Sequence, residues 1–440
     1  MLDQSFSAEN FRRILDLENR KGLYLEGRFF PSLNGITEQI KQCTKDIITK
    51  RKNKATKDEL NELYKQRNKL KAQKEKKLNS ELEKVSKKVL KSDFSIDMEP
   101  EAIPGEKPIY ITKDTPEHFF ALKQVQANFS RLFGIKQSNR FAIVSQVKNL
   151  LNDEFPKYVL RTDIDDFYEN IPQKYLLDKI NRDNLLTPFS RKILRQILKK
   201  YRELSGSDKG IPRGIGVSAY FAELYMRDID KEIMAMDNVT YFARYVDDII
   251  IIFIPSSRAK NVDYLKKLKK IVAKYKLKLN DRKTLSCDLL NEQQLCSFEY
   301  LGYKFFFGNG EVKTRFPDKK IEKYKSRINL AFNHYLNLSR VNEKDARNIL
   351  VKRIRFLTGN TRLKNNKENI MVGIYYSNSQ LSEKNDFKKL DRFLRTKIDE
   401  KIDSPQLRER LKRCNFKESF ETRRFSPFKA HELKEIMKIW

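Results

Sequence analysis

The chain has 440 residues, with 91 Lys and Arg against 59 Asp and Glu, and therefore carries a formal net charge of +32. A surplus of this size favours a polyanionic partner, and nucleic acid is the usual one. Binding to a membrane surface is the competing interpretation, but no apolar run approaches the length of a membrane span and no signal peptide opens the sequence. We therefore expect a protein of two or three domains without a membrane segment.

The four cysteines are Cys43, Cys287, Cys296 and Cys414, and none has CxxC spacing. Only three histidines accompany them. The pattern predicts neither a zinc site nor a disulfide framework. A reduced, cytoplasmic protein is the expectation that follows.

Residues 1–24 carry a helix signal, in which Ser7 can cap the helix and Phe11, Ile14 and Leu15 supply an apolar face. We expect this helix to dock against the body of the protein. Arg12 and its basic neighbours leave an RNA contact open as an alternative.

Residues 41–92 are Lys-rich and contain neither Gly nor Pro. Their apolar residues recur at helical spacing, which predicts a helical hairpin or long helices with one packed face. The segment has 18 Lys and Arg against 7 Asp and Glu. A solvated helix face is the plain interpretation, and binding to RNA or DNA phosphates is the functional one. The lysines that we expect to contact phosphates are Lys69, Lys71, Lys74, Lys76 and Lys77.

Residues 93–110 contain Pro100, Pro104, Gly105 and Pro108 and predict a linker or extended connection. A mixed helical region follows. Residues 158–171 then predict a strand that ends on Asp163. Residues 175–205 predict helices that contain no candidate catalytic residue. Residues 210–226 are a Gly-Pro-rich loop that runs into a helix, as expected of backbone that must approach a substrate closely.

Residues 242–253 form an apolar, β-prone run that two adjacent acids, Asp247 and Asp248, interrupt at its centre. This pattern predicts a strand, a turn and a strand with the acids at the tip. An exposed Asp-Asp turn is the plain alternative. If Asp163 lies beside this turn, three carboxylates converge and can hold two Mg²⁺ ions about 3.5–4 Å apart. That arrangement is what nucleotidyl transfer requires.

From about residue 311 the chain is basic and predicted to be helical. Residues 352–381 interleave basic and aromatic side chains, which can grip a nucleic acid backbone and stack on bases. A pair of tyrosines that packs between helices is the alternative. The residues of interest are Arg353, Arg355, Arg362, Lys364, Tyr375, Tyr376 and Asn378.

Taken together, these segments resemble the palm motifs of reverse transcriptases, in order and at plausible spacing. The tetrad of aromatic, any residue, Asp, Asp is matched by Tyr245, Val246, Asp247 and Asp248. The other matches are Asp163 with Tyr168 for the first palm motif, Gly210, Pro212, Gly214 and Ser218 for the glycine-rich motif, residues 277–284 for the motif that supplies a lysine, and residues 298–305 for the primer-grip hairpin. The resemblance covers roughly residues 130–310.

The resemblance implies a role for each matched residue. Asp163, Asp247 and Asp248, with the backbone carbonyl of Ile164, would bind two Mg²⁺ ions, with Mn²⁺ as an alternative metal. Lys283 would lie near the leaving pyrophosphate, and Tyr168 would exclude a 2′-hydroxyl from the nucleotide site. The residues expected to contact the incoming nucleotide are Tyr168, Arg140, Pro212, Arg213 and Gly214, with Lys136 and Arg161 as further candidates for its triphosphate.

Three departures from the common pattern are Arg213 in place of Gln, Ala219 in place of Pro and Glu223 in place of Asn. The form Ser-Ala-Tyr-x-Ala-Glu-Leu-Tyr at residues 218–225 is similar to bacterial abortive-infection and antiviral, defence-associated reverse transcriptases. This subgroup leaves ordinary template use open, because some of its members make repetitive or untemplated DNA.

The sequence therefore predicts an α+β right-hand polymerase, with helical fingers, a palm built on an antiparallel sheet, a helical thumb and a Lys-rich helical extension. We expect the extension at residues 1–100, fingers and palm at 101–310 and the thumb at 311–440. The expected function is RNA-directed DNA synthesis from dNTPs on a noncoding RNA template, in antiviral defence. Template-independent or protein-primed DNA synthesis is one alternative, and a catalytically unused nucleic-acid-binding scaffold is another. A second reverse transcriptase or a second copy of the chain is a further expected partner.

Overall fold

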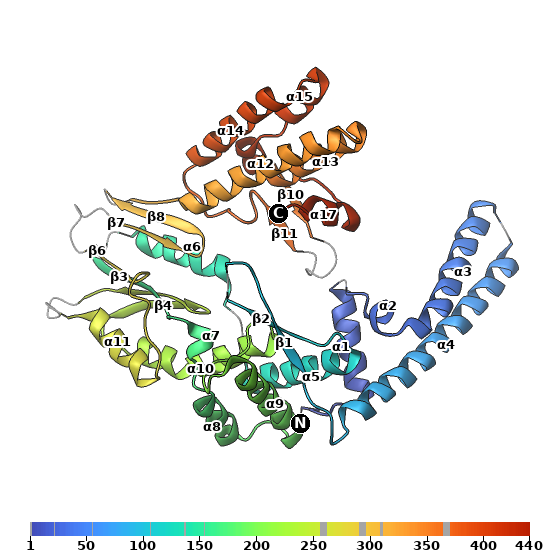
Figure 1. Cartoon of the computed structure of the whole chain (residues 1–440), viewed down its shortest axis with the longest axis horizontal. Coiled ribbons are helices and arrows are strands. Elements are labelled where there is room, and N and C mark those ends of the chain that lie inside the picture. The colour runs from blue at the N-terminus through green and yellow to red at the C-terminus, as the bar shows by residue number, and fades with distance from the viewer. Residues whose placement is uncertain are drawn as a thin grey trace. The chain divides into compact units, whose positions relative to one another are not determined.

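The structure is a computed structural model, and it describes residues 2–21, 23–54, 56–105, 107–135, 138–153, 155–255, 262–289, 296–308, 311–363 and 370–440. The chain forms two units that do not follow chain order (Figure 1). Unit 1 comprises residues 1–136 and 166–228, and unit 2 comprises residues 137–165 and 229–440. The expected division into extension, fingers with palm, and thumb stays a prediction. Within the described ranges, no helix is both long enough and apolar enough to cross a bilayer.

Unit 1 begins with α1 (Ala8–Arg20), which confirms the predicted N-terminal helix. The Oγ atom of Ser7 accepts a hydrogen bond from the amide of Asn10 at 3.3 Å and so caps the helix. Phe11 and Leu15 are fully buried. They face α4 and α5 of the same unit, so this helix docks through its apolar stripe as expected.

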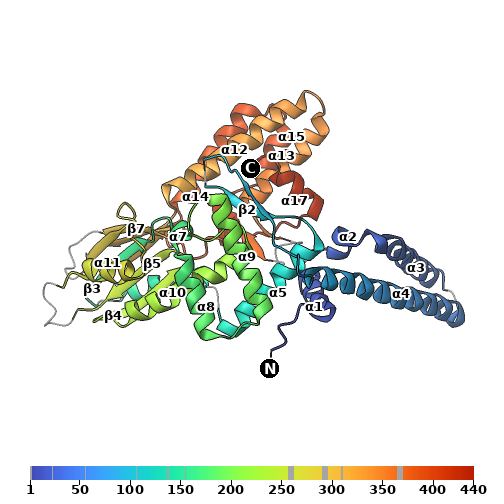
Figure 2. The ribbon, with the colours of Figure 1, turned by 60° about the horizontal axis from the view of Figure 1, so that its bottom comes forward.

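The Lys-rich segment is a helical hairpin, formed by α3 (Asn34–Lys52) and α4 (Lys57–Val89). In both views the hairpin projects from the rest of unit 1 (Figures 1 and 2). Leu78, Leu82, Val85 and Val89, in the second half of α4, are buried. Residues 34–89, which we call the arm, are therefore anchored at one end of α4, and most of their lysines remain exposed.

Of the two predictions for residues 93–110, the linker is wrong and the extended connection is correct, because this segment contains strands that pair as an antiparallel hairpin. Strand β1 (Met98–Glu101) pairs with β2 (Ile109–Thr112), and Pro100 lies opposite Tyr110. A proline is tolerated in a two-stranded sheet because each strand there is an edge strand. The remaining elements that begin in unit 1 are α2 (Leu25–Phe29), η1 (Pro31–Leu33), α5 (Pro116–Phe133), α7 (Phe167–Asn170), α8 (Gln173–Asp183), α9 (Pro188–Ser205) and α10 (Gly216–Met234).

Unit 2 is built on an antiparallel sheet of strand order β4-β5-β3-β6. Its strands are β3 (Lys157–Asp163), β4 (Val239–Tyr245), β5 (Asp248–Phe253) and β6 (Leu285–Leu289). Ile250 and Ile252 of β5 pack in one core with Val144 and Val147 of α6 (Arg140–Leu151). On alternate positions, the ring of Phe253 stacks 4.0 Å from that of Tyr264 in α11 (Tyr264–Lys274). Both faces of β5 are thus covered, which explains its continuous apolar run.

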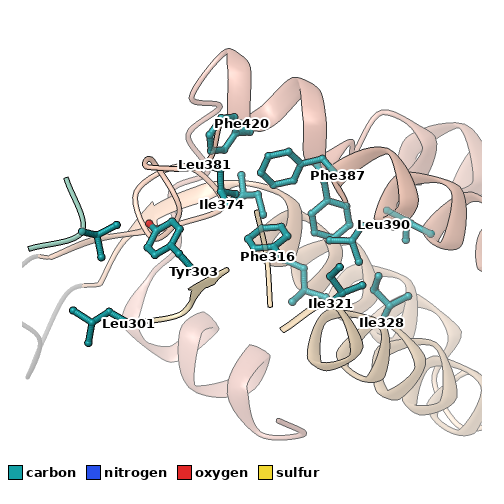
Figure 3. Packing of buried hydrophobic residues seen from close by; sticks show 14 of the residues in the cluster. Leu301, Tyr303, Phe316, Ile321, Ile328, Ile374, Leu381, Phe387, Leu390 and Phe420 are labelled. Atoms are coloured by element: carbon teal, nitrogen blue, oxygen red, sulfur yellow. The ribbon is translucent and has the colours of Figure 1, made fainter. Parts of the chain in front are cut away.

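A second sheet of unit 2 has the order β7-β8-β9, with strands β7 (Cys296–Tyr300), β8 (Tyr303–Gly308) and β9 (Glu311–Arg315). The later elements are α12 (Asp318–Ser339), α13 (Glu343–Thr358), β10 (Asn360–Arg362), β11 (Met371–Gly373), α14 (Asn385–Lys401), α15 (Pro405–Lys412), α16 (Phe416–Glu421) and α17 (Ala430–Met437). Their core includes Phe316, Phe387 and Phe420 (Figure 3). The ring of Phe387 lies 5.2 Å from that of Phe316 and 4.6 Å from that of Phe420, which ties the end of the sheet to these helices.

The cysteines depart from the expectation in one respect. Cys287 of β6 and Cys296 of β7 form a disulfide. Their separation of 9 residues gave no motif that would have marked them as a pair. Cys43 and Cys414 are buried, free thiols.

Candidate active site

The acids of the predicted hairpin lie where two central strands end. Strands β4 and β5 are antiparallel, Tyr245 pairs with Asp248, and Val246 and Asp247 form the two-residue turn between them. On the other side of β5, Asp163 lies directly opposite Asp248. The pairing therefore brings together the three acids named from the sequence, and the exposed-turn alternative for Asp247 and Asp248 is not what the structure shows, since neither residue is exposed.

The turn itself is strained. Val246 has a φ of +61°, a left-handed conformation that β-branched residues rarely adopt. A buried arginine holds it in place: Nη1 of Arg244 donates to the carbonyl oxygen of Val246 at 2.7 Å. The same guanidinium binds both carboxylate oxygens of Asp230, at 2.8 and 2.7 Å. Arg244 was not among the residues predicted for this site, although an arginine within an apolar strand signals a buried partner.

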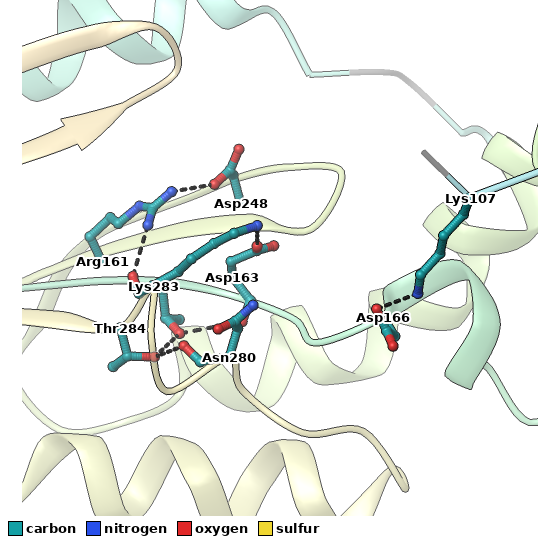
Figure 4. Close-up of polar contacts among 9 residues, drawn as sticks. Lys107, Arg161, Asp163, Asp166, Asp248, Asn280, Lys283 and Thr284 are labelled. Carbon is teal, nitrogen blue, oxygen red and sulfur yellow. Dashed lines mark hydrogen bonds and ion pairs between the residues drawn. The ribbon is translucent and has the colours of Figure 1, made fainter. Parts of the chain in front are cut away.

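Two cations bind the carboxylates (Figure 4). Nζ of Lys283 binds Oδ2 of Asp163, whose side chain is nearly inaccessible to solvent. Nη2 of Arg161 donates to Oδ1 of Asp248 at 2.8 Å, and its Nη1 donates to the carbonyl oxygen of Lys283. These contacts offset part of the repulsion among the acids.

The remaining repulsion is reflected in the pKa values. Burial, and then the charge of Asp163, raise the pKa of Asp247 to about 6. Burial also raises the pKa of Asp248, although Arg161 opposes that effect. The pKa of Lys283 is raised, chiefly by its hydrogen bond to Asp163, so this lysine is protonated at neutral pH. The site is therefore short of positive charge around Asp247.

The segment after α11 places Lys283 by backbone contacts. The amide of Asn280 donates to the carbonyl oxygen of Asp163 at 2.8 Å, and the amide of Asp165 donates to that of Lys278 at 2.9 Å. The hydroxyl of Thr284 lies 2.6 Å from that of Thr162 and donates to the carbonyl oxygen of Asn280 (Figure 4). Asn280 and Thr284 were not identified from the sequence, where nothing distinguishes them from ordinary turn residues.

The donor set suits a hard divalent cation. Carboxylate and carbonyl oxygens are the ligands that Mg²⁺ prefers. Oδ1 of Asp163 is buried and has no hydrogen-bond partner, and the two backbone bonds around Ile164 do not use its carbonyl oxygen. Across the described ranges, however, no three His, Cys, Asp or Glu side chains are placed as a metal site. Lys283 binds Oδ2 of Asp163 and Arg161 binds Oδ1 of Asp248, so both cations would compete with a metal for these two oxygens.

The glycine-rich loop and Tyr168 belong to unit 1. The amide of Ile211 donates to the carbonyl oxygen of Tyr168 at 2.8 Å, and the amide of Tyr110 donates to that of Arg213 at 2.7 Å. Gly214 has a φ of +91°, and a Cβ atom there would lie 2.6 Å from the carbonyl oxygen of Tyr110. A neighbouring strand of the protein therefore requires glycine at this position, whereas the sequence suggested a close approach to a substrate.

The side chain of Arg213 is fixed in two ways. Its Nε lies 2.9 Å from a carboxylate oxygen of Glu169, and its guanidinium lies 5.6 Å from the ring centre of Tyr168. In the same unit, Lys107 forms an ion pair with Asp166 (Figure 4). Pro212 is buried in this loop. The nucleotide contacts of Tyr168, Pro212, Arg213 and Gly214 stay predictions.

The arginines expected at the triphosphate have other contacts. Arg140, the first residue of α6, donates through Nε to the carbonyl oxygen of Leu301 at 2.8 Å. Leu301 and Gly302 form the tight turn of the β7–β8 hairpin, with φ values of +45° and +73°. Arg161 is bound to Asp248, as described above. Lys136 and Lys364 lie outside the described residues.

An antiparallel sheet that clusters three carboxylates at the ends of its central strands, with a lysine beside them, is suited to metal-assisted nucleotidyl transfer. Residues 111–305 match the family described as reverse transcriptase (RNA-dependent DNA polymerase). This part of the chain is therefore a reverse transcriptase domain, as the motifs predicted. The match includes the three acids, Lys283 and Tyr168.

Solved structures with some likeness are telomerases. That of apo telomerase from Candida tropicalis has a TM-score of 0.39 and 15% identity, over 79% of this chain and 67% of that one. Telomerase from Candida albicans with a fragment of telomeric RNA gives 0.36 and 13%, over 78% of this chain and 63% of that one. A truncated C. tropicalis telomerase gives 0.36 and 14%, over 50% of this chain and 54% of that one. TM-scores this low do not establish a shared fold. A comparison with curated proteins gave no match.

Proposed function

We propose that the protein synthesises DNA on an RNA template at the cluster of Asp163, Asp247 and Asp248. The observation that carries this proposal is the strand register, in which Asp163 lies opposite Asp248 while Asp247 occupies the adjoining turn. Burial and the charge of Asp163 raise the pKa of Asp247, which supports a role for added positive charge beside its carboxylate. The reverse transcriptase domain at residues 111–305 supplies the class of reaction.

We assign metal binding to the three aspartates and the carbonyl oxygen of Ile164, with Mg²⁺ or Mn²⁺ as the ion. When bound, two such ions lower the barrier to attack by a primer hydroxyl and to departure of pyrophosphate. Lys283 then has a proton to give to the departing group, because its pKa is raised and its side chain is 56% exposed. Arg161 stays beside Asp248 and offsets its charge.

Tyr168 is assigned to sugar selection. Its backbone carbonyl accepts a hydrogen bond from Ile211, and the guanidinium of Arg213 lies over its ring. The backbone bond fixes the main chain at Tyr168, and the guanidinium restricts the ring. A restricted ring can exclude a 2′-hydroxyl more sharply than a mobile one, since it cannot yield.

Primer extension with the aspartate variants tests the proposed function. Asp163→Ala and Asp247→Ala should abolish dNTP incorporation while RNA affinity changes little, because other, basic surfaces hold phosphates. Asp237→Ala is the matched control, since that acid is 80% exposed and, among the described residues, pairs with one surface lysine, Lys267. Full incorporation by either site variant would remove the metal assignment.

We propose further that the arm binds an RNA partner, a noncoding RNA used as template in bacterial antiviral defence. The structure refines the set of contacts expected from the sequence. Lys74 forms a largely buried ion pair with Glu26 at 2.5 Å, and Lys77 donates to the carbonyl oxygen of Ser32. These two lysines stabilise the base of the arm, although Lys77 is itself exposed, and the exposed Lys69, Lys71 and Lys76 form the refined set.

The triple variant Lys69→Gln, Lys71→Gln, Lys76→Gln should therefore bind the RNA that copurifies with the protein more weakly. The magnitude of its log–log salt slope should fall by up to roughly 0.9 for each phosphate of a duplex that is no longer neutralised. A matched triple Gln variant of α11 at positions Lys266, Lys267 and Lys270 controls for net charge. Equal affinity and slope in the arm variant and the wild type would make the arm a solvated packing element.

Two alternative functions make different predictions in the same assays. Template-independent or protein-primed synthesis predicts incorporation that survives removal of the RNA. A scaffold without catalysis predicts that the aspartate variants retain every biological effect of the wild type. The raised pKa of Asp247 favours an enzyme, because a scaffold gains nothing from a buried, repelling carboxylate.

A further inference from the structure

A cavity of about 430 Å³ lies among the C-terminal helices of unit 2. This volume falls in the lower part of the range for small-molecule sites. Helices α12, α13 and α17 supply its walls, and none of the acids of the active site lines it. The lining residues that carry the argument are His334, Asp345, Lys352, Arg353, Glu435 and Lys438.

Arg353 is the unusual member of this cavity. It is only 2% exposed, yet among the described residues it has no ion pair with a carboxylate. Nε donates to the carbonyl oxygen of Ile436 at 3.4 Å and Nη2 to that of Glu435 at 3.2 Å, while Nη1 has no hydrogen-bond partner within the described part of the chain. Capping the end of α17 explains the two carbonyl contacts, and it leaves part of a buried guanidinium unsatisfied. Such an unsatisfied charged donor is costly unless a ligand completes it.

The groups around Arg353 favour an anion. Nδ1 of His334 is buried and has no hydrogen-bond partner in the ranges that the structure describes. The charges of Arg353 and Lys438 add to burial in lowering the pKa of His334. The two cations therefore act on the same ring. Lys352 is offset by Glu432 at 2.9 Å, whereas Lys438 is exposed. The acids of the cavity, Asp345 and Glu435, are exposed.

The positions of these charges favour a terminal phosphate over a phosphate diester within a strand. Exposed carboxylates at the rim repel an extended phosphate backbone, while the guanidinium lies too deep for a diester within a continuous strand. A terminal phosphate projects from its strand and carries a charge of about −1.5 to −2. A guanidinium binds such a group by parallel hydrogen bonds.

We propose that this cavity binds a phosphate monoester, of the kind carried by the 5′ end of a nucleic acid strand. The choice of nucleic acid rests on the proposed function, whereas the choice of phosphate rests on the cavity alone. The site would hold one end of a bound strand apart from the acids where synthesis is proposed.

Fluorescence anisotropy with the full-length protein tests this proposal. Two single-stranded RNA oligonucleotides of one sequence, with a 5′-phosphate or a 5′-hydroxyl, are the probes. The wild type should bind the 5′-phosphate oligonucleotide about tenfold more tightly, because this ratio corresponds to one hydrogen bond to a charged group. Arg353→Met should lose that preference. Lys344→Met is the matched control, because Lys344 is exposed on the same helix and does not line the cavity.

Arg353→Met can fail to fold, because it also removes the contacts to the carbonyl oxygens of Glu435 and Ile436. Lys438→Glu keeps those contacts and reverses an exposed charge of the cavity, so it should reduce the preference in a folded protein. Inorganic phosphate should compete for the preference, and chloride at equal ionic strength should not. Equal affinity of the wild type for the two oligonucleotides overturns the proposal, as does inorganic phosphate binding without any such preference. Primer extension by the same samples separates this result from a failure of the proposed function.

Discussion

The clearest quantitative consequence of the acid cluster concerns Asp247 in the absence of metal. Asp247→Asn removes a charge that is partly buried beside Asp163 and keeps the size of the side chain. A shift of the pKa from its ordinary value to about 6 is equivalent to ~3 kcal/mol. Because the carboxyl is only partly buried, solvent screening reduces this figure, and we expect a gain in unfolding free energy of about 1–2 kcal/mol.

The sign of the pH dependence follows from the raised pKa. The folded state holds the proton of Asp247 more tightly than the unfolded state does, so the wild type loses stability as the pH rises from about 4 to about 6. Above that window the full cost is present. The gain from Asp247→Asn should therefore be largest at pH 7 and above, and should vanish near pH 4.

Thermal unfolding in a chelating buffer measures this effect. Each kcal/mol of unfolding free energy is equivalent to a shift in Tm of roughly 2–4 °C for a unit of the size of unit 2. Asp237→Asn, the same change at an exposed acid, should stay within about 0.5 kcal/mol of the wild type. If Asp247→Asn is no more stable than Asp237→Asn at pH 7, the carboxylates do not repel one another as the structure indicates. Added Mg²⁺ should stabilise the wild type more than Asp247→Asn.

Three further predictions concern single residues. Lys283→Ala should lower kcat with little change in KM for dNTPs, which single-turnover kinetics can show, and should tighten Mg²⁺ binding in a metal titration. An effect on KM alone would count against its role at the leaving group. Tyr168→Ala should raise the ratio of rNTP to dNTP incorporation, and an unchanged ratio in a folded variant would make Tyr168 a packing residue. Arg244→Met should lower the free energy of unfolding by about 3 kcal/mol, measured by urea denaturation, because it removes the guanidinium that binds both carboxylate oxygens of Asp230.

Local patterns in the sequence predicted much of this architecture. The apolar, β-prone run that Asp247 and Asp248 interrupt predicted the β4–β5 hairpin and its acidic turn, and Ser7 marked the start of α1. Helical spacing in the Lys-rich segment predicted the arm. These features depend on residues close together in the chain, so a single sequence contains what is needed to find them.

The features that the sequence did not predict depend on contacts between residues that are far apart in the chain. The proline-rich segment at residues 93–110 has the composition of a linker, and only the pairing of β1 with β2 makes it a hairpin. Arg161 was assigned to a triphosphate, but the register of β3 with β5 places it beside Asp248, which lies 87 positions later. Similarly, Arg140 binds Leu301 at a separation of 161 positions. Which side chains meet across strands is set by register, and register was not readable from local pattern alone.

The two cations at the acid cluster differ in a way that bears on how metal would enter. The side chain of Arg161 is 17% exposed and also binds the carbonyl oxygen of Lys283, so its position is fixed by two contacts. The side chain of Lys283 is 56% exposed and its flexible stem has only Asp163 as a charged partner within ion-pair distance among the described residues. Displacing the lysine therefore costs less than displacing the arginine. We expect metal to replace Lys283 on Asp163 and to leave the lysine protonated nearby, where a departing pyrophosphate would need a proton.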